Sequence, residues 1–473
     1  MKHLWINGQS VPTEHYQVIT SPFSNNELDK VSEATIQDVH HAISVAKQAF
    51  LTYKKTPAHK RAEILMNVVH LLRENHEECS KLITLESGKA IKDARKEMDR
   101  TIMTYTFAAE EARRLTGQTI PLDAAPGGEN RVAYTVREPL GVIGAITPFN
   151  FPMNLVAHKV GPAIASGNTV VLKPASQTPL SSYKLAELFQ QAGLPDGVLN
   201  VVTGKGNIVG NALVESKDVK MITFTGSPLV GKAIREKAGL KKVTLELGSN
   251  SALIIDKDVS ISPVIKRIVT GAFSYQGQVC ISIQRIFVHE NVYEEFLNLF
   301  QLATKDLILG DPLNEDTDLS CMISPEETER ILNWVREAVG DGATIVAGGE
   351  VMDGIMTPTI LTDVPRNAKI SCQEAFAPVV AIYKISDLNE AIDRVNESPY
   401  GLQAGVYTNN LQSSFKACQE LHVGGVMIND IPTFRVDQMP YGGVKESGTG
   451  REGIPYSIEE MTEIKLVTFN LNS

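Results

Sequence analysis

The sequence predicts an α/β protein with two layers of mainly parallel β-sheet and a small third sheet. Three observations predict this fold class. Short apolar runs alternate with helical patterns after Arg137, and a second such series follows Glu246. Two further strand-like stretches, RVAYTVREP and MTEIKLVTFN, stand apart from both series. Repeated strand–helix–strand units build parallel sheets that are covered by helices.

The amino-terminal part is mostly helical in pattern. Thr35–Phe50 and Ala58–Glu74 carry apolar residues at steps of three and four, with Lys, Glu and His between them, which predicts amphipathic helices. The first strand series then follows as GVIGAIT, NTVVLKP and GVLNVVTG, separated by the helical stretches VAHKVGPAIASG and LSSYKLAELFQQAG. Its strands are short, apolar and bounded by Gly, Pro or Asn, as buried parallel strands are.

The second series supplies the other layer. Its strands are SALIIDKD, RIFVHE, TIVAGG, PTILTDV and PVVAIYKI, and helices are expected near Ile261–Tyr275 and Tyr293–Leu307. The junction between the layers is expected near Leu247–Asn250, where a strand ends in Gly-Ser-Asn. The two isolated strands need partners, so together they predict a small separate sheet at a subunit interface.

The amino-acid composition and charge argue against several classes of protein. The 473 residues have a net charge of −10, 43% hydrophobic and 21% charged residues, which is ordinary globular usage and disfavours nucleic-acid binding. The sequence contains neither a membrane-length apolar run nor a signal-like start, so we expect a cytoplasmic protein. The five cysteines are widely scattered, which argues against a disulfide framework or a metal site.

Three motifs carry candidate catalytic residues. Cys280 in SYQGQVCISIQR is a candidate nucleophile, although a lone cysteine is more often a buried apolar residue. Glu246 in VTLELGSN is a candidate general base if it is buried, or a solvent-facing strand residue if it is not. Asn150 in GAITPFNFP could donate to an oxyanion, or merely cap the next helix.

Three other motifs suit a nucleotide. Lys173 in TVVLKPASQTP ends a strand, where parallel sheets bind nucleotides, or is an ordinary surface lysine. The turn in ITFTGSPLVGKAI, with Gly226, Ser227 and Gly231, opens a helix whose N-terminus suits a pyrophosphate, or is only a turn. In QEAFAPVVAI, Glu374 and Phe376 could contact a ribose and a nicotinamide, or be a loop glutamate and a core phenylalanine.

The order and spacing of these motifs resemble the NAD(P)-dependent aldehyde dehydrogenase superfamily nearly end to end. FNFP, VLKP, FTGS, LELG, GQVC, EAFAP and PYGGVKESGTGREG carry the resemblance. It implies that Cys280 attacks the aldehyde, that Asn150 and the Cys280 N–H hold the oxyanion, and that Glu246 activates the water that hydrolyses the thioester. It places Lys159 and Glu452 in a proton path behind that base.

The resemblance also implies cofactor contacts and an architecture. The residues implied to bind NAD(P) are Thr147, Pro148, Phe149, Lys173, Ser176, Gly226, Ser227, Gly231, Leu247, Glu374 and Phe376. Ser176 stands where NAD-preferring members carry Glu, so NADP is allowed beside NAD. The family has a Rossmann-like cofactor domain, expected here at 1–115 and 138–247. A catalytic domain is expected at 248–445, and bridging strands at 116–137 and 455–473 are expected to form a homodimer or homotetramer.

The substrate is expected to be a small, polar aldehyde. GQVCIS and PYGGVKESGTGREG look most like the branch that oxidises lactaldehyde and related short hydroxyaldehydes. Members that act on glyceraldehyde phosphate often carry Arg where this chain has Val279. Arg100 and Arg435 are candidates to bind a carboxylate, sulfonate or hydroxyl, or have local partners such as Asp437 for Arg435. The other expected substrate contacts are Met153, Asn154, His158, Val279 and Ile281.

Other functions are weighed against this one. A CoA-acylating semialdehyde dehydrogenase would lack the base that Glu246 supplies, and a non-phosphorylating glyceraldehyde-3-phosphate dehydrogenase is a second relative on the same fold. A thiol hydrolase would need a histidine paired with Cys280 and no dinucleotide contacts. A non-catalytic binding protein would not need the complete set of catalytic residues.

Overall fold

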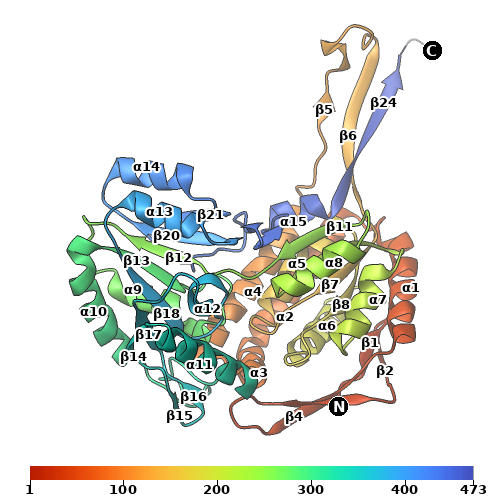
Figure 1. Cartoon of the computed structure of the whole chain (residues 1–473). Coiled ribbons are helices and arrows are strands. Elements are labelled where there is room, and N and C mark those ends of the chain that lie inside the picture. The colour runs from red at the N-terminus through yellow and green to blue at the C-terminus, as the bar shows by residue number, and fades with distance from the viewer. Residues whose placement is uncertain (472–473) are drawn as a thin grey trace.

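A computed structural model describes residues 1–471 of the chain. Two sheets, each covered by helices, lie side by side, and a long narrow sheet projects from one end (Figure 1). This architecture confirms the α/β class, with one sheet for each predicted series and a separate third sheet.

The first sheet has eight strands in the order β2-β1-β9-β8-β7-β10-β11-β23, of which β9, β8, β7, β10 and β11 run parallel. Its strands are β1 (Leu4–Ile6), β2 (Gln9–Val11), β7 (Val142–Ile146), β8 (Thr169–Lys173), β9 (Leu199–Val201), β10 (Val219–Thr225), β11 (Lys242–Glu246) and β23 (Gly448–Thr449). The helices of this half of the molecule are α1 (Ile36–Tyr53), α2 (Ala58–Glu74), α3 (His76–Ser87), α4 (Ile91–Ala112), α5 (Asn154–Ser166), α6 (Leu180–Gln191), α7 (Asn211–Glu215), α8 (Pro228–Lys237) and α15 (Ile454–Glu460). Strands β7 and β8 are buried at every position, as parallel strands between helix layers must be.

The second sheet has seven strands in the order β14-β17-β18-β13-β12-β20-β21, and only β14 is antiparallel to its neighbour. Its strands are β12 (Ala252–Ile255), β13 (Arg285–His289), β14 (Thr344–Ala347), β17 (Thr359–Thr362), β18 (Val379–Ile385), β20 (Gln403–Tyr407) and β21 (Gly425–Ile428). Its helices are α9 (Ile265–Phe273), α10 (Tyr293–Lys305), α11 (Pro325–Gly340), α12 (Lys369–Cys372), α13 (Leu388–Asn396) and α14 (Leu411–Glu420). The chain passes from the first sheet to the second between Glu246 and Ala252.

The helix expected at Ile261–Tyr275 is shorter than predicted, because α9 begins only at Ile265 and ends at Phe273. Pro263 lies in the turn before it, where a missing N–H costs no helical hydrogen bond. After Phe273 the chain makes a tight turn in which Tyr275, Gln276 and Gly277 all have positive φ, at 48°, 54° and 66°. Three left-handed residues in succession cannot continue a helix.

The third sheet joins the two isolated strands. β24 (Thr462–Asn470) pairs antiparallel with β6 (Arg131–Pro139) along its whole length, and β5 (Thr119–Ile120) adds to the other side of β6. This sheet is the projection in Figure 1, and we call it the arm. Three two-stranded ribbons complete the fold: β3 (Tyr16–Thr20) with β4 (Glu27–Ser32), β15 (Val351–Met352) with β16 (Ile355–Met356), and β19 (Tyr400–Gly401) with β22 (Val444–Lys445). Within residues 1–471, none of the helices is both long and apolar enough to span a membrane.

The first sheet brings several predicted site residues to one edge. Ile146 is paired in register with Lys173, and Thr225 with Glu246, at the carboxyl ends of parallel strands. Thr147 and Gly226 follow directly in the chain. This edge faces the second sheet, and open parallel sheets bind ligands at such an edge.

Candidate active site

One cavity of about 360 Å³ lies between the two halves of the molecule and takes its wall from both of them. The wall includes the three predicted catalytic residues, Cys280, Glu246 and Asn150. Residues from α4, α5, the turn after α9 and the segment that follows β21 complete it. They include Lys89, Glu97, Arg100, Phe151, Asn154, Leu247, Tyr275, Val279, Ile281, Arg435, Tyr441 and Glu452.

Cys280 follows the tight turn after α9 and is partly exposed to the cavity. The turn needs Gly277, because a Cβ there would lie 2.2 Å from the carbonyl oxygen of Ala377. Burial raises the pKa of the Cys280 thiol to about 12, and the carboxylates of Glu374 and Glu246 add to the shift. The resting thiol is therefore protonated, and it becomes a nucleophile only when a base or a nearby positive charge assists loss of the proton.

Glu246 ends β11 and is buried, with 3% of its surface exposed, so the interpretation as a solvent-facing strand residue is wrong. Neither carboxylate oxygen has a hydrogen-bond partner within residues 1–471. Burial and the charge of Glu452 raise its pKa well above the ordinary value, although Arg435 and Lys159 oppose the shift. A carboxylate in this state can take a proton from water near neutral pH.

Asn150 is held between the two halves of the site rather than at a helix end. Its Nδ2 donates to the carbonyl oxygen of Gln278 at 2.9 Å. The next helix, α5, begins four residues later, and Met153 at its N-cap makes no side-chain cap bond. The prediction of a simple helix cap is therefore wrong, and the amide lies in the cavity wall beside Cys280.

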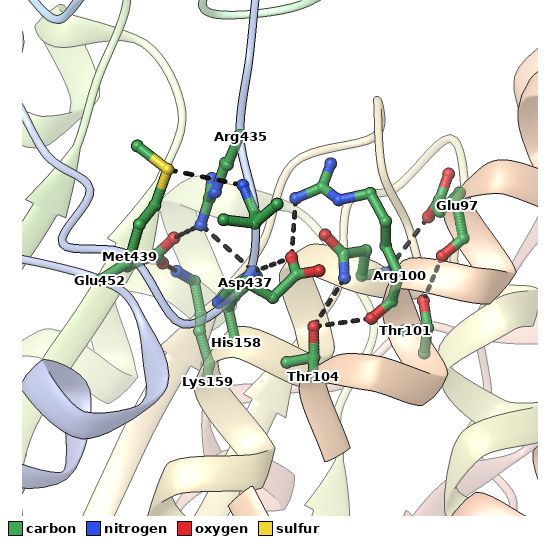
Figure 2. Close-up of polar contacts among 12 residues, drawn as sticks. Glu97, Arg100, Thr101, Thr104, His158, Lys159, Arg435, Asp437, Met439 and Glu452 are labelled. Carbon is green, nitrogen blue, oxygen red and sulfur yellow. Dashed lines mark hydrogen bonds and ion pairs between the residues drawn. The ribbon is translucent and has the colours of Figure 1, made fainter. Parts of the chain in front are cut away.

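Behind Glu246 lies a buried charge network (Figure 2). Lys159 Nζ lies 2.7 Å from Glu452 Oε1 and 2.7 Å from the hydroxyl of Thr225. Arg435 Nη2 lies 3.0 Å from Glu452 Oε2, and its guanidinium stacks 3.6 Å from the ring centre of Tyr441. Burial alone would raise the pKa of Glu452, but Lys159 and Arg435 bring it down to about 2, so Glu452 is a permanent anion.

In one of two interpretations the sequence offered Asp437 as a local partner of Arg435, and that pairing is wrong, because Arg435 pairs with Glu452. Asp437 Oδ1 instead accepts from Arg100 Nη2 at 2.7 Å and lies 2.9 Å from His158 Nε2, and Figure 2 shows it between those residues. The Nε groups of Arg100 and Arg435 have no partner among the described residues. Both arginines line the cavity, and each keeps one buried N–H without a partner in residues 1–471.

Not every expected substrate residue reaches the cavity. Arg100, Asn154, Val279, Ile281 and Arg435 do. Met153 does not, because its side chain is fully buried in the core of the first half. His158 does not either, because its ring is fully buried under Asp437. Successive residues of a helix point about 100° apart, so Met153 points away from Asn154 and Leu155, which line the cavity. His158 lies on the same face as Asn154 but one turn further along α5, where it contacts Asp437 instead of the cavity.

The expected dinucleotide contacts gather at the same sheet edge. Lys173 is buried, and its ammonium makes a 3.0 Å bond to the Pro174 carbonyl, so it is not a surface lysine. Burial lowers its pKa to about 8. The rings of Phe149 and Phe376 meet edge to face at 5.8 Å. Glu374 Oε1 accepts from the Ser249 N–H at 2.9 Å.

The remaining expected contacts lie on this edge or on the turns that leave it: Thr147, Pro148, Ser176, Gly226, Ser227, Gly231 and Leu247. Small residues are required at two of them. A Cβ on Gly231 would lie 2.5 Å from the side chain of Leu247, and one on Gly226 would lie 2.5 Å from Phe224. Ser227 caps α8 by accepting from the N–H of Val230. The exposed first turn of that helix suits a phosphate.

Residues 5–467 match the aldehyde dehydrogenase family. The chain belongs to this family. A 3-sulfolactaldehyde dehydrogenase from Priestia aryabhattai is 48% identical over 99% of this chain and 98% of its own. Aldehyde dehydrogenase 21 from Physcomitrella patens, solved in complex with the reaction product succinate, is 39% identical, with TM-score 0.97 over 100% of this chain and 98% of its own. A glyceraldehyde-3-phosphate dehydrogenase from Methanocaldococcus jannaschii, complexed with NADP, is 39% identical, with TM-score 0.93 over 97% and 100%.

This aldehyde dehydrogenase is thus an NAD(P)-dependent oxidoreductase that converts an aldehyde to a carboxylic acid. The residues at the sheet edge fit such a cofactor: a buried ammonium, a half-buried carboxyl, two aromatic rings and a helix N-terminus meet there. A Cβ on Gly248 would lie 2.2 Å from Glu374 Oε2, which shows how closely that carboxyl approaches the backbone after β11.

Sequence reasoning missed three residues of this aldehyde dehydrogenase site: Lys89, Glu97 and Tyr441. All three are buried. Lys89 and Glu97 lie eight residues apart around the start of α4, and only an unusual Gly-Lys turn before a helix marks them in the sequence. Tyr441 stands inside the PYGGVKESGTGREG motif, which could have drawn attention to it.

Proposed function

We propose that Cys280, Asn150 and Glu246 perform the oxidation at this cavity. The Cys280 thiol loses its proton to water, and its sulfur adds to the aldehyde carbon to form a thiohemiacetal, whose oxyanion accepts from Asn150 Nδ2 and the Cys280 N–H. Bound NAD(P) would supply the hydride acceptor that makes this adduct a thioester. Glu246 then takes a proton from a second water as its oxygen attacks the thioester carbon. The C–S bond breaks, the acid leaves as a carboxylate and a proton, and the Cys280 thiolate takes up a proton from water.

The unpartnered carboxylate of Glu246 is the observation that supports these roles best. Nearly all buried polar groups in proteins have partners, and a buried carboxylate with two free oxygens beside a thiol is set up to receive a proton. Lys159 Nζ bonds both Glu452 and the Thr225 hydroxyl, and Glu452 and Thr225 line the same cavity as Glu246. We propose that the proton taken from water leaves along this polar cluster, in which Glu452 stays ionised.

The substrate proposed here is a small aldehyde with an anionic or hydroxyl-bearing tail, such as sulfolactaldehyde, succinic semialdehyde or lactaldehyde. Arg100 and Arg435 support this, because both bring a positive charge to the cavity wall. Guanidinium groups bind carboxylate and sulfonate strongly. The names of the Priestia relative and of the succinate complex point to the same chemistry.

The test is an aldehyde panel followed at the nicotinamide absorbance with NAD and with NADP. We expect the three polar aldehydes to give higher kcat/KM than hexanal or benzaldehyde, and Cys280→Ala to abolish turnover. Cys79→Ala is a matched control, because this thiol is fully buried in the core away from the cavity. Faster turnover of the long or aromatic aldehydes would contradict the substrate class, and turnover by Cys280→Ala would contradict the mechanism.

A second candidate is a non-phosphorylating glyceraldehyde-3-phosphate dehydrogenase, which the Methanocaldococcus structure favours. Val279 beside the nucleophile offers no charge to a phosphate, so we rank this second. A CoA-acylating enzyme would not need Glu246, and NADH formation without CoA would exclude it. Adding glyceraldehyde 3-phosphate and CoA to the same panel therefore separates all three activities.

We also propose that the enzyme assembles as a homodimer or homotetramer through the arm. Its sheet exposes Val132, Tyr134 and Phe469 on one face and Ile464 and Leu466 on the other, which leaves apolar side chains in water on both sides of an isolated ribbon. β21 leaves one edge of the second sheet without a partner in the described chain. Addition of an arm strand from another subunit would cover that edge and bring the apolar arm against a second surface.

A further inference from the structure

Lys89 occupies an unusual place for a lysine, since its side chain is only 1% exposed and lies directly behind the proposed oxyanion site. It stands in the turn between α3 and α4, after Gly88, which ends α3 in the left-handed conformation with φ of 70°. A buried ammonium is costly unless every proton has a partner. The groups that contact the Lys89 ammonium therefore indicate its role in the site.

Those partners belong to the two loops that carry the proposed catalytic groups. Lys89 Nζ donates to the backbone carbonyl of Asn150 at 2.8 Å. It also lies 3.8 Å from the ring centre of Phe151, the next residue of that loop, and 4.5 Å from the ring centre of Tyr275. Tyr275 begins the left-handed turn that leads to Cys280, so one cation contacts both loops.

Glu97 completes the arrangement from the first turns of α4. Its Oε2 forms the ion pair with Lys89. Its Oε1 accepts from the backbone N–H groups of Met153 and Asn154, at 3.0 and 3.2 Å. These N–H groups open α5, so Glu97 fixes the far end of the same loop, and its negative charge is favourable at a helix N-terminus.

The nucleophile loop is tied to the same place by two further bonds. The Tyr275 hydroxyl donates to the Ser87 carbonyl at 3.1 Å, two residues before Lys89. Asn150 Nδ2 donates to the Gln278 carbonyl at 2.9 Å, two residues before Cys280. The turn contains two non-glycine residues with positive φ. Such strain persists only where the surroundings impose it.

We infer that the buried Lys89–Glu97 pair is a positioning device that sets the distance between the Asn150 amide and the Cys280 thiol. This inference rests on the proposed roles of Asn150 and Cys280. In this positioning role, neither Lys89 nor Glu97 exchanges a proton with the substrate. Lys89 instead holds the Asn150 carbonyl and both aromatic rings, while Glu97 holds the start of α5, so the donor and the nucleophile keep one geometry.

The variants are Lys89→Met, which keeps the length of the side chain without its charge, and Lys89→Arg, which restores a cation. A control is Glu86→Gln. Glu86 is another buried carboxylate, on α3, but it accepts from Leu180 and Ser181 at the start of α6 and has no hydrogen bond to either catalytic loop among the described residues. Thermal unfolding and NAD(P) affinity measured for all variants report a purely structural loss.

The informative measurement is the rate of the first-turnover burst of reduced cofactor with saturating aldehyde. Because a misplacement of about 1 Å can cost ~100-fold in rate, we expect Lys89→Met to slow the burst at least ~10-fold. Lys89→Arg should recover part of the loss. Glu86→Gln should lower the unfolding temperature yet leave the burst within about twofold of the wild type.

A double-mutant cycle separates positioning from general damage. If Lys89 acts through Asn150, Lys89→Met should slow the burst less than ~3-fold in an Asn150→Ala background, since coupled residues are not additive. An unchanged burst in Lys89→Met, or equal losses in both backgrounds, would overturn the inference. Failure of the proposed function is a different result, namely turnover by Cys280→Ala.

Discussion

Replacement of Arg435 by Met tests whether the cavity recognises an anionic tail. The guanidinium is 7% exposed, stacks on Tyr441 at 3.6 Å and has an unpaired Nε. Methionine keeps the apolar contact with the ring but not the charge. A hydrogen bond to a charged group is worth ~1.5–3 kcal/mol, and 1.4 kcal/mol is about tenfold. We therefore expect kcat/KM for succinic semialdehyde or sulfolactaldehyde to fall ~10–100-fold.

The comparison substrate is lactaldehyde, which has no charge, and its kcat/KM should fall much less. Arg267→Met is the matched control variant. Arg267 also lines the cavity, but it is 47% exposed and Asp430 binds it through both oxygens, at 2.8 and 3.1 Å. We expect only small changes with either substrate in this control. Equal losses of Arg435→Met on charged and neutral aldehydes would refute anion recognition and assign Arg435 to the charge network alone.

The same variant has a consequence for pH and stability. Breaking a buried ion pair typically costs ~3–5 kcal/mol, and we expect the lower end because Lys159 stays 2.7 Å from Glu452. Arg435 also lowers the pKa of Glu246. Its removal should raise that pKa, so the base is deprotonated only at higher pH. The rising limb of the steady-state rate with lactaldehyde should shift to higher pH, and an unshifted limb would contradict this electrostatic coupling.

Three further predictions follow from the site and the arm. Glu246→Gln should keep the first burst of reduced cofactor but slow the steady state. We expect the wild-type steady-state rate to rise as pH increases through the raised pKa of Glu246, and this rise should be lost in the variant. A slowed burst would show that Glu246 serves acylation instead. Ser176→Glu should lower kcat/KM for NADP relative to NAD, because a carboxylate repels a 2′-phosphate; an unchanged cofactor ratio would contradict the place of Ser176 at the ribose. Leu466→Asp should reduce the sedimentation coefficient by breaking the arm interface, since Leu466 is 56% exposed in the single chain, and an unchanged coefficient would mean that the arm does not assemble the subunits.

The fold was predictable because its signals are local. Apolar runs bounded by Gly, Pro or Asn predicted β7, β8 and β9, and the isolated stretches predicted β6 and β24. The strained turn at Tyr275 was not predictable, because Tyr and Gln rarely adopt positive φ and nothing in their identity indicates it. It depends on tertiary contacts such as the hydroxyl bond to Ser87, 188 residues away in the chain.

Site residues that stand in recognisable motifs were predictable, whereas those that are defined by their charged partners were not. The motifs marked Glu246 and Lys173 as candidates at the ends of apolar strands, but the sequence left their burial open, since each could also have faced solvent. The partner of Arg435 did not follow, because Asp437 is two residues away and Glu452 is 17 away, and sequence distance favours the wrong one. The burial of Lys89 and Glu97 could not be predicted for a related reason, since a lysine and a glutamate near the start of a helix are usually exposed to solvent.

The two buried glutamates of the network show why the structure, rather than residue type, assigns the proposed base. Glu452 accepts from Lys159 and Arg435, and these two cations keep it ionised and make it a weak base. Glu246 accepts from no group among residues 1–471, and it lies beside that fixed negative charge, which favours its protonated form. When the surroundings raise the pKa of one carboxyl group and lower that of its neighbour, the two groups take different roles in proton transfer. On this argument Glu246 is the group that gains and loses the proton, and the fixed charge of Glu452 helps to raise the pKa at which it does so, while Lys159 opposes that shift.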